Sequence, residues 1–81
     1  MTRTVLYIPP TPADTVRCLL EIEPGQRVLY YTGRSLVDDR RRCAIIDRTA
    51  AVAHTLRSKG RMILVQRPNN RGGKDHIAIG R

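Results

Sequence analysis

The stretch that decides the fold is "DRTAAVAHTLRSKGRMILVQRPNNRGGKDHIAIG", residues 47–80, which passes from a helical period to two alternating runs. In "RMILVQR" (61–67) and "DHIAIGR" (75–81), apolar side chains recur at every second position, which is typical of strands. The "PNNRGG" segment between them contains Asn and Gly, which tolerate the positive φ angles of tight turns. The sequence therefore predicts a β-hairpin at the end of the chain.

The segment from Ser35 to Gly60 carries helix start and stop signals. Ser35 and Asp38 form a loose capping box, and Gly60 follows the last helical positions. A 100° period places Ile45, Ile46, Thr49, Val52, Ala53 and Leu56 on one side and Asp47, Arg48, Ala51, His54, Thr55 and Ser58 on the other. One unbroken helix would put Arg42 in the apolar stripe, whereas a break between 42 and 47 avoids this. Asp47 would then cap a second helix over 48–59, and both alternatives stay open.

The first third of the chain predicts an arm, a helix and a strand. "RTVLYIPP" reads as an extended segment over 3–8, within an N-terminal arm of residues 1–10. Thr11 can cap a helix over 12–22, and "QRVLYYTG" favours a strand over 27–32. Because successive strand residues point to opposite faces, we expect one of Tyr30 and Tyr31 to pack and the other to face solvent or a partner.

Charge is the strongest global feature of this 81-residue chain. Fifteen Lys and Arg against seven Asp and Glu give a net charge of +8, and thirteen of those cations are Arg. Residues 1–39 sum to −1 (four Arg, five acids), and residues 40–81 sum to +9 (eleven basic residues, two acids). Such an asymmetry favours a phosphate backbone or another acidic surface as the partner, and the guanidinium fork suits phosphate and guanine.

Several classes of function are disfavoured by what the sequence contains. Cys18 and Cys43 are not in a metal or redox spacing, so we expect reduced thiols, a cytoplasmic location and no structural zinc. The apolar run "MILV" is too short to cross a membrane. His54 and His76 have no carboxylate in motif spacing, and the adjacent Asp38 and Asp39 suit a helix start better than a metal. We expect no enzymatic activity, no metal and no cofactor.

The predicted order is helix, strand, helix, helix, strand, loop, strand. This order resembles the winged helix-turn-helix family, best over residues 47–80. The resemblance implies a single α+β domain, 1–81, with helices packed on a short antiparallel sheet. It also implies a recognition helix over 48–58 in the major groove of DNA and a basic wing over 67–74 on the flanking backbone. The segment "LVDDRRRC" (36–43) departs from the family, because it is charged where core residues are expected and lacks the usual turn Gly.

Three hypotheses for function remain open. The first is a duplex-DNA-binding regulator of transcription, the second a protein–protein module whose basic face docks on an acidic host protein, and the third an RNA binder. The small size, the many Arg and "YYTG" after an opening helix also resemble short phage and prophage proteins. A homodimer would suit paired DNA half-sites, and the 3–8 arm could pair across subunits. The candidate nucleic-acid-binding residues are Arg40, Arg41, Arg42, Arg48, His54, Thr55, Arg67, Asn70, Arg71 and Lys74.

Overall fold

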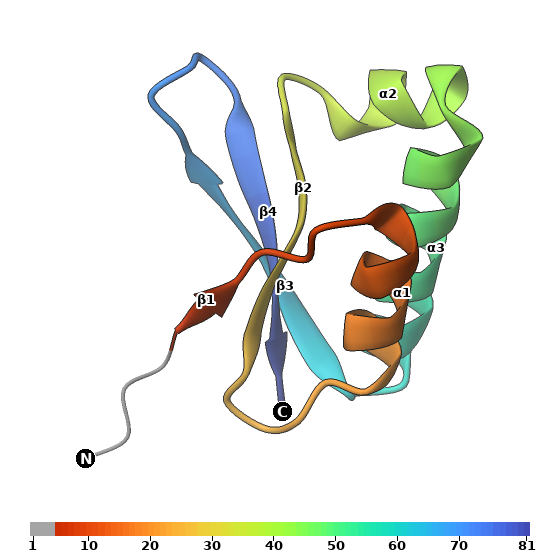
Figure 1. Ribbon diagram of the computed structural model, residues 1–81, viewed down its shortest axis with the longest axis vertical. Helices are drawn as coiled ribbons and strands as arrows, with labels where there is room; N and C mark the ends of the chain where they lie inside the picture. Colours follow the sequence, from red (N-terminus) through yellow and green to blue (C-terminus); the bar gives the residue numbers. More distant parts are fainter. Residues whose placement is uncertain (1–4) are drawn as a thin grey trace.

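The computed structural model describes residues 5–81 and shows three helices on one side of a four-stranded sheet (Figure 1). In chain order the elements are β1 (Leu6–Tyr7), α1 (Pro12–Leu20), β2 (Arg27–Gly33), α2 (Leu36–Arg42), α3 (Ala44–Ser58), β3 (Met62–Pro68) and β4 (Lys74–Gly80). The chain forms a compact α+β domain, as the sequence predicts.

The sheet is mixed rather than wholly antiparallel. Its strand order is β1-β2-β4-β3, with β4 antiparallel to both β2 and β3. β1 lies parallel to β2, with Leu6 beside Arg27 and Tyr7 beside Val28. The prediction of an antiparallel sheet is wrong for this strand, because the chain crosses over through α1 and returns in the same direction. The predicted arm over 3–8 lies partly outside the described residues, and its described part pairs within the chain.

Helix α1 begins where the sequence predicts and ends earlier. The Thr11 hydroxyl accepts a hydrogen bond from the Asp14 backbone N–H at 3.1 Å, and Pro12 opens the helix. The helix stops at Leu20 instead of residue 22, and Gly25 at φ +86° turns the chain toward β2. Ile22 is still buried, so the turn after the helix contributes to the core.

Helices α2 and α3 are two helices that meet at an angle (Figure 1), which confirms the predicted break. Ser35 caps α2 as predicted, because its hydroxyl accepts from the Asp38 N–H at 3.2 Å. The break lies at Cys43, whose backbone is extended at φ −136° and ψ 112°. The predicted cap at Asp47 and start at 48 are therefore wrong. Asp47 lies in the first turn of α3, where its N–H already bonds to the Cys43 carbonyl.

The core lies between the helices and the inner face of the sheet. Leu19 and Met62 are its largest fully buried side chains, and Val28, Leu56 and Ala78 pack with them. The stripe expected on α3 is confirmed for Thr49, Ala53 and Leu56, which are buried, and for Ile46 and Val52, which pack against the core. Ile45 departs from it with 55% of its surface exposed, because it lies in the first turn of α3 beside a groove that α1 leaves open.

Tyr30 and Tyr31 are both buried, which contradicts the expected alternation. Leu29 pairs with Ile77 and Tyr31 pairs with His76, so β2 has one extra residue at this point. Such a bulge re-aims side chains, and both tyrosine rings meet the ring of His76 edge-on, with centroid distances of 6.0 Å and 5.1 Å. The tyrosines are therefore core residues and present no aromatic surface to a partner.

Candidate nucleic-acid interface

The loop between β3 and β4 is held by the side chain of Asn69. Its Oδ1 accepts from the backbone N–H groups of Arg71 and Gly73, at 2.9 Å and 3.0 Å. Its Nδ2 donates to Thr32 Oγ1 and Asp75 Oδ1, both at 3.2 Å. One side chain therefore fixes the loop and ties it to β2. Of the turn residues that tolerate a positive φ, Gly72 adopts one at +80°, whereas Asn69 and Asn70 do not.

Asp75 is the centre of a polar network beneath this loop. Thr32 donates to it at 2.7 Å, and the Arg67 Nε donates at 3.3 Å. Hydrogen bonds from Thr32, then Asn69, then Arg67 lower the pKa of the Asp75 carboxyl below its usual value. Arg67, a predicted nucleic-acid contact, is thus paired within the chain, although more than half of its side chain stays exposed.

A small hollow separates the loop from the end of β2. It measures about 230 Å³ and is lined by Thr32, Gly33, Arg34, Asn69, Arg71 and Gly73. Gly73 allows the two segments to approach, because a Cβ there would lie 2.7 Å from the Gly33 carbonyl oxygen. Arg34 and Arg71 border the same hollow although they are distant in sequence. Sequence reasoning missed Arg34, because only the pairing of Gly33 with Lys74 brings it to the loop.

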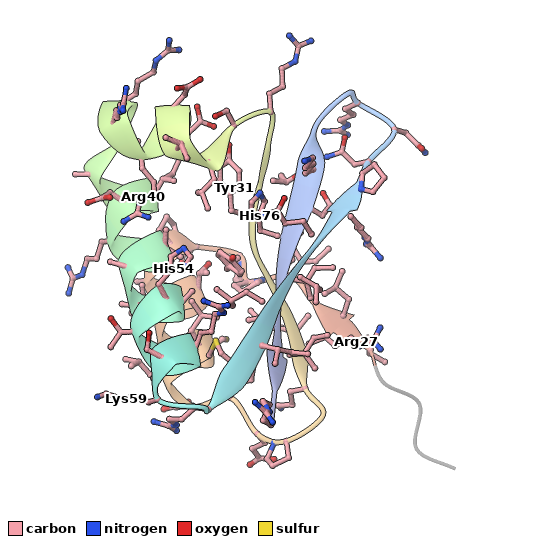
Figure 2. The ribbon with its side chains drawn as sticks, turned by 180° about the vertical axis from the view of Figure 1, so that it is seen from behind. Arg27, Tyr31, Arg40, His54, Lys59 and His76 are labelled. Atoms are coloured by element: carbon pink, nitrogen blue, oxygen red, sulfur yellow. The ribbon has the colours of Figure 1, made fainter. Side chains whose placement is uncertain are left out.

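Helix α2 contributes two free cations rather than three. The Arg40 Nε bonds to Asp47 Oδ1 at 2.8 Å, so this predicted contact neutralises an acid of α3. Arg41 and Arg42 are exposed and have no ion pair within residues 5–81. Figure 2 shows Arg40 at the end of the molecule where α2 lies, above His54.

The predicted residues of α3 do not share one face. Arg48 lines an apolar groove of about 520 Å³ between α1 and α3, next to Ile45 and Val16. Thr55 is exposed two turns further along the same side of the helix. His54 is exposed on the side nearer the sheet (Figure 2), close enough for its charge to help lower the pKa of His76. Of these three residues, Arg48 and Thr55 alone share a stripe.

Arg34 and eight of the cations in residues 40–81 form two groups at opposite ends of α3. The first group, here called the basic end, comprises the unpaired Arg34, Arg41, Arg42, Arg71 and Lys74, which lie on the β2–α2 turn, on α2, on the β3–β4 loop and at the start of β4 (Figure 1). Exposed Asn70 lies in the same loop. Lys59 lies at the other end (Figure 2), with Arg57, Arg61 and Arg81 on neighbouring segments. The positive charge is thus divided between two ends of the molecule and is not gathered on one surface.

The second group has roles within the fold. Arg57 and Lys59 lie at the C-terminal end of α3, where the helix dipole favours cations. The Arg61 guanidinium donates to the Leu20 carbonyl at 3.2 Å and so satisfies the C-terminal end of α1. Arg34, Arg71 and Lys74 have no comparable partner among the described residues. The basic end is therefore the better candidate for an external anion.

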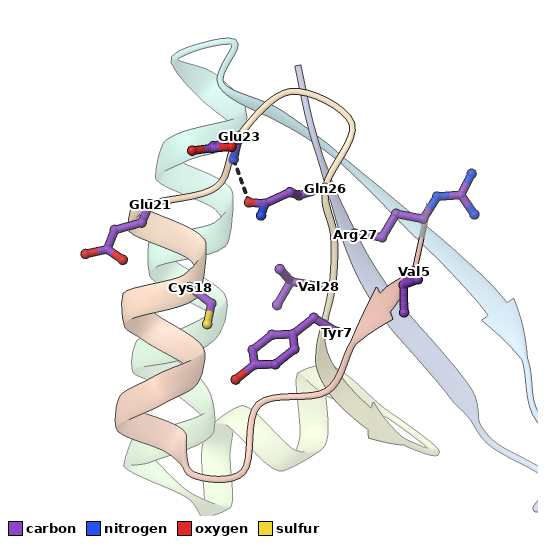
Figure 3. Close-up of a pocket in the computed structure, with 8 residues that line it drawn as sticks. All are labelled: Val5, Tyr7, Cys18, Glu21, Glu23, Gln26, Arg27 and Val28. Carbon is purple, nitrogen blue, oxygen red and sulfur yellow. Dashed lines mark hydrogen bonds between the residues drawn. The ribbon is translucent and has the colours of Figure 1, made fainter. Parts of the chain in front are cut away.

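A groove on the other side of α1 has a different character (Figure 3). It measures about 590 Å³ between α1 and the β1–β2 pair, and Tyr7, Cys18 and Val28 line it. Two acids, Glu21 and Glu23, border it against one cation, Arg27, so it does not suit a polyanion. Residues 5–81 contain no group of three His, Cys, Asp or Glu side chains placed to hold a metal ion.

Comparisons with protein-family models, with curated proteins and with solved structures find no significant match to this chain. Among the helices described, none is long and apolar enough to span a membrane.

Proposed function

We propose that the protein binds nucleic acid, with duplex DNA as the preferred ligand, through its basic end. The observation that carries the proposal is the position of Arg34 and Arg71 on either side of a glycine-lined hollow, with no acid paired to either among the described residues. A guanidinium binds phosphate through two parallel hydrogen bonds, and glycine lets an anion approach the backbone. Lys74, Arg41 and Arg42 extend the positive charge on both sides of this hollow.

The loop is suited to this role because it is ordered before any ligand binds. The Asn69 side chain accepts from the backbone N–H groups of Arg71 and Gly73 and donates to Thr32 and Asp75, which holds the loop against β2 and β4. A preorganised contact loses less conformational entropy on binding than a mobile hairpin tip would. Arg71 and Asn70 can therefore contact a phosphate backbone without refolding the loop.

A more specific version of this proposal is that the protein binds DNA in a winged-helix-like arrangement. The order from α1 to β4, with the loop between β3 and β4, supports the resemblance drawn from the sequence. In this arrangement α3 enters the major groove, where exposed Arg48 reads base edges and the short side chain of Thr55 permits close approach. A role as a small transcription regulator, in the manner of phage proteins, belongs to the same proposal. The single-residue joint at Cys43 is its main departure from a helix-turn-helix.

The proposal is tested by fluorescence anisotropy with labelled duplex DNA, single-stranded DNA and RNA at two salt concentrations. We expect the duplex to bind best and its affinity to fall as salt rises, because phosphate contacts release counterions. The absence of binding to all three ligands at low salt would refute the proposal.

An acidic protein partner is the second candidate, and a different observation favours it. Val37 and Ile45 are 63% and 55% exposed on α2 and α3, the two helices that also carry Arg41 and Arg48. Apolar side chains among cations contribute little to phosphate binding, but they suit a protein surface that is both acidic and apolar. This candidate becomes the preferred one if the three nucleic acids fail to bind.

A further inference from the structure

Two hollows beside α1 and α3 form one continuous groove. The larger is the groove of about 520 Å³ that Arg48 lines, and the smaller measures about 240 Å³ and reaches Tyr30 of β2. Four residues line both hollows: Thr11, Pro12, Ile45 and Thr49. Because α1 and α3 pack side by side (Figure 1), these walls belong to the ordered part of the fold. The combined space is called the α1–α3 groove below.

The walls of the α1–α3 groove are mostly apolar. Val16 of α1 and Ile45 of α3 line it, and so do three prolines of the segment 9–12. Ile45 is 55% exposed, so the groove leaves apolar surface in contact with water. Hollows with apolar walls and a few polar groups are the usual sites of small organic ligands. An apolar molecule that covers Ile45 would therefore be stabilised by the hydrophobic effect.

The polar side chains of the groove differ in whether they already have a partner. The hydroxyls of Thr15 and Thr49 donate to backbone carbonyls four residues earlier, at 3.0 Å and 2.9 Å. The Thr11 hydroxyl accepts the capping hydrogen bond of α1. Within residues 5–81, the two lining side chains that bond to no other group are those of Tyr30 and Arg48.

Tyr30 places an unbonded hydroxyl at one end of the groove. The residue is 9% exposed, and burial is the cause that raises the pKa of its phenol, without any hydrogen bond. In the described chain, no fully buried side-chain N or O lacks a partner. The Tyr30 oxygen must therefore be open to the hollow that the residue lines. A hydroxyl that is largely buried and has no protein partner is a point where a ligand can form a hydrogen bond.

Arg48 supplies the charge at the other end of the groove. It lines the larger hollow but not the smaller one, and it is exposed without an ion pair in residues 5–81. No acidic side chain among the described residues lines either hollow, and the neighbouring Asp47 is held by Arg40. A guanidinium binds a carboxylate through two parallel hydrogen bonds. The groove therefore suits an anion whose remaining part is apolar.

We propose that the α1–α3 groove binds a small apolar carboxylate with a hydroxyl at its far end, of the class of medium-chain hydroxy acids. The carboxylate lies against Arg48, the apolar body covers Val16 and Ile45, and the distal hydroxyl bonds to Tyr30. A phosphate backbone does not fit here, because its charge repeats along its length and it offers no apolar segment to these walls. The groove shares no residue with the basic end, so ligand binding here and nucleic-acid binding there fail independently.

Methyl NMR of the full chain, titrated with ω-hydroxyoctanoate to millimolar concentration, tests the inference. Signals of Val16, Ile45 and Ile46 should shift, whereas that of Ile63, which lies outside the groove, should not. Octanoate lacks the distal hydroxyl and octanamide also lacks the charge, so these two compounds are the matched ligands. We expect ω-hydroxyoctanoate to bind best and octanamide to bind worst.

Two variants separate the roles of the two polar ends. Arg48→Gln should weaken both carboxylates by about fivefold, the upper end for an exposed ion pair, and leave octanamide unchanged. Tyr30→Phe should weaken ω-hydroxyoctanoate by about two- to tenfold, to the affinity of octanoate, and leave octanoate unchanged. This variant removes no hydrogen bond of the fold, so it should remain folded. The control Arg57→Gln, which removes an exposed cation of α3 outside the groove, should alter none of the three affinities.

Three results would overturn the inference. The first is the absence of shifts at Val16 and Ile45 with every ligand. The second is equal affinity for the three ligands, which would show that neither polar end is recognised. The third is an equal loss of affinity in Arg48→Gln and Arg57→Gln, which would show a general effect of net charge.

Discussion

The substitution Asn69→Ala tests how the loop is built. It removes two acceptor and two donor interactions, which link the loop backbone to β2 and β4. Each such bond contributes about 0.5–1.5 kcal/mol net, and partial exposure favours the lower half of that range. We therefore expect the free energy of unfolding to fall by about 2–4 kcal/mol for the four bonds. In a domain of this size the midpoint of thermal unfolding should then drop by about 10 °C or more.

The neighbouring Asn70 is the matched control, because it has the same side chain, lies in the same loop and is exposed. Asn70→Ala should change the free energy of unfolding by less than about 0.5 kcal/mol, as is usual for a surface position. Urea denaturation followed by circular dichroism measures both variants. Equal stability of the two variants would show that the Asn69 network does not hold the loop.

Three further predictions concern the core. Leu19 is 0% exposed, so Leu19→Ala should lower the free energy of unfolding by about 2–5 kcal/mol. Leu20 is 49% exposed, so Leu20→Ala should lower it by less than about 1 kcal/mol, as measured by urea denaturation. Burial and the hydrogen bond to Asp39 raise the pKa of Tyr31 to about 12. Because the folded state holds this proton more tightly than the unfolded state, the free energy of unfolding should fall as the pH rises from 10.0 toward 12. In a titration followed by tyrosinate absorbance, the transition at the highest pH should be absent from Tyr31→Phe. Burial, followed by the charge of Lys74, lowers the pKa of His76 below 6.5. The free energy of unfolding should therefore fall as the pH drops below that value, and this fall should be less steep in the variant His76→Gln.

The features that the sequence predicts correctly are those encoded by neighbouring residues. The caps at Thr11 and Ser35 require a hydroxyl and an N–H three residues apart, and both form. The break before α3 is one of the two alternatives that the sequence leaves open, and it keeps Arg42 out of the apolar stripe. The hairpin follows from alternation and from turn residues. Local rules therefore recover the order of the elements from α1 to β4, although not every boundary and not the pairing of β1 with β2.

The features that sequence reasoning missed depend on register between distant segments. The bulge near Tyr30 is visible only when β2 is aligned on β4. The same alignment places Arg34 beside Arg71, and no spacing in the sequence indicates this proximity. The ion pairs of Arg40 and Arg67 likewise remove charge that a count of residues treats as free. The sequence therefore indicates the loop and α2 as parts of the candidate site, but not Arg34 on the turn that follows β2.

The salt dependence of duplex-DNA affinity tests the central claim most directly. If all five unpaired cations of the basic end contact phosphate, the slope of log affinity against log salt should be about −4.5, at about 0.9 per contact. Arg34→Ala/Arg71→Ala should reduce it by about 1.8, and Arg57→Ala/Lys59→Ala, with the same loss of charge at the other end, should leave it unchanged. Equal slopes for the two double variants would contradict the assignment of phosphate binding to the basic end.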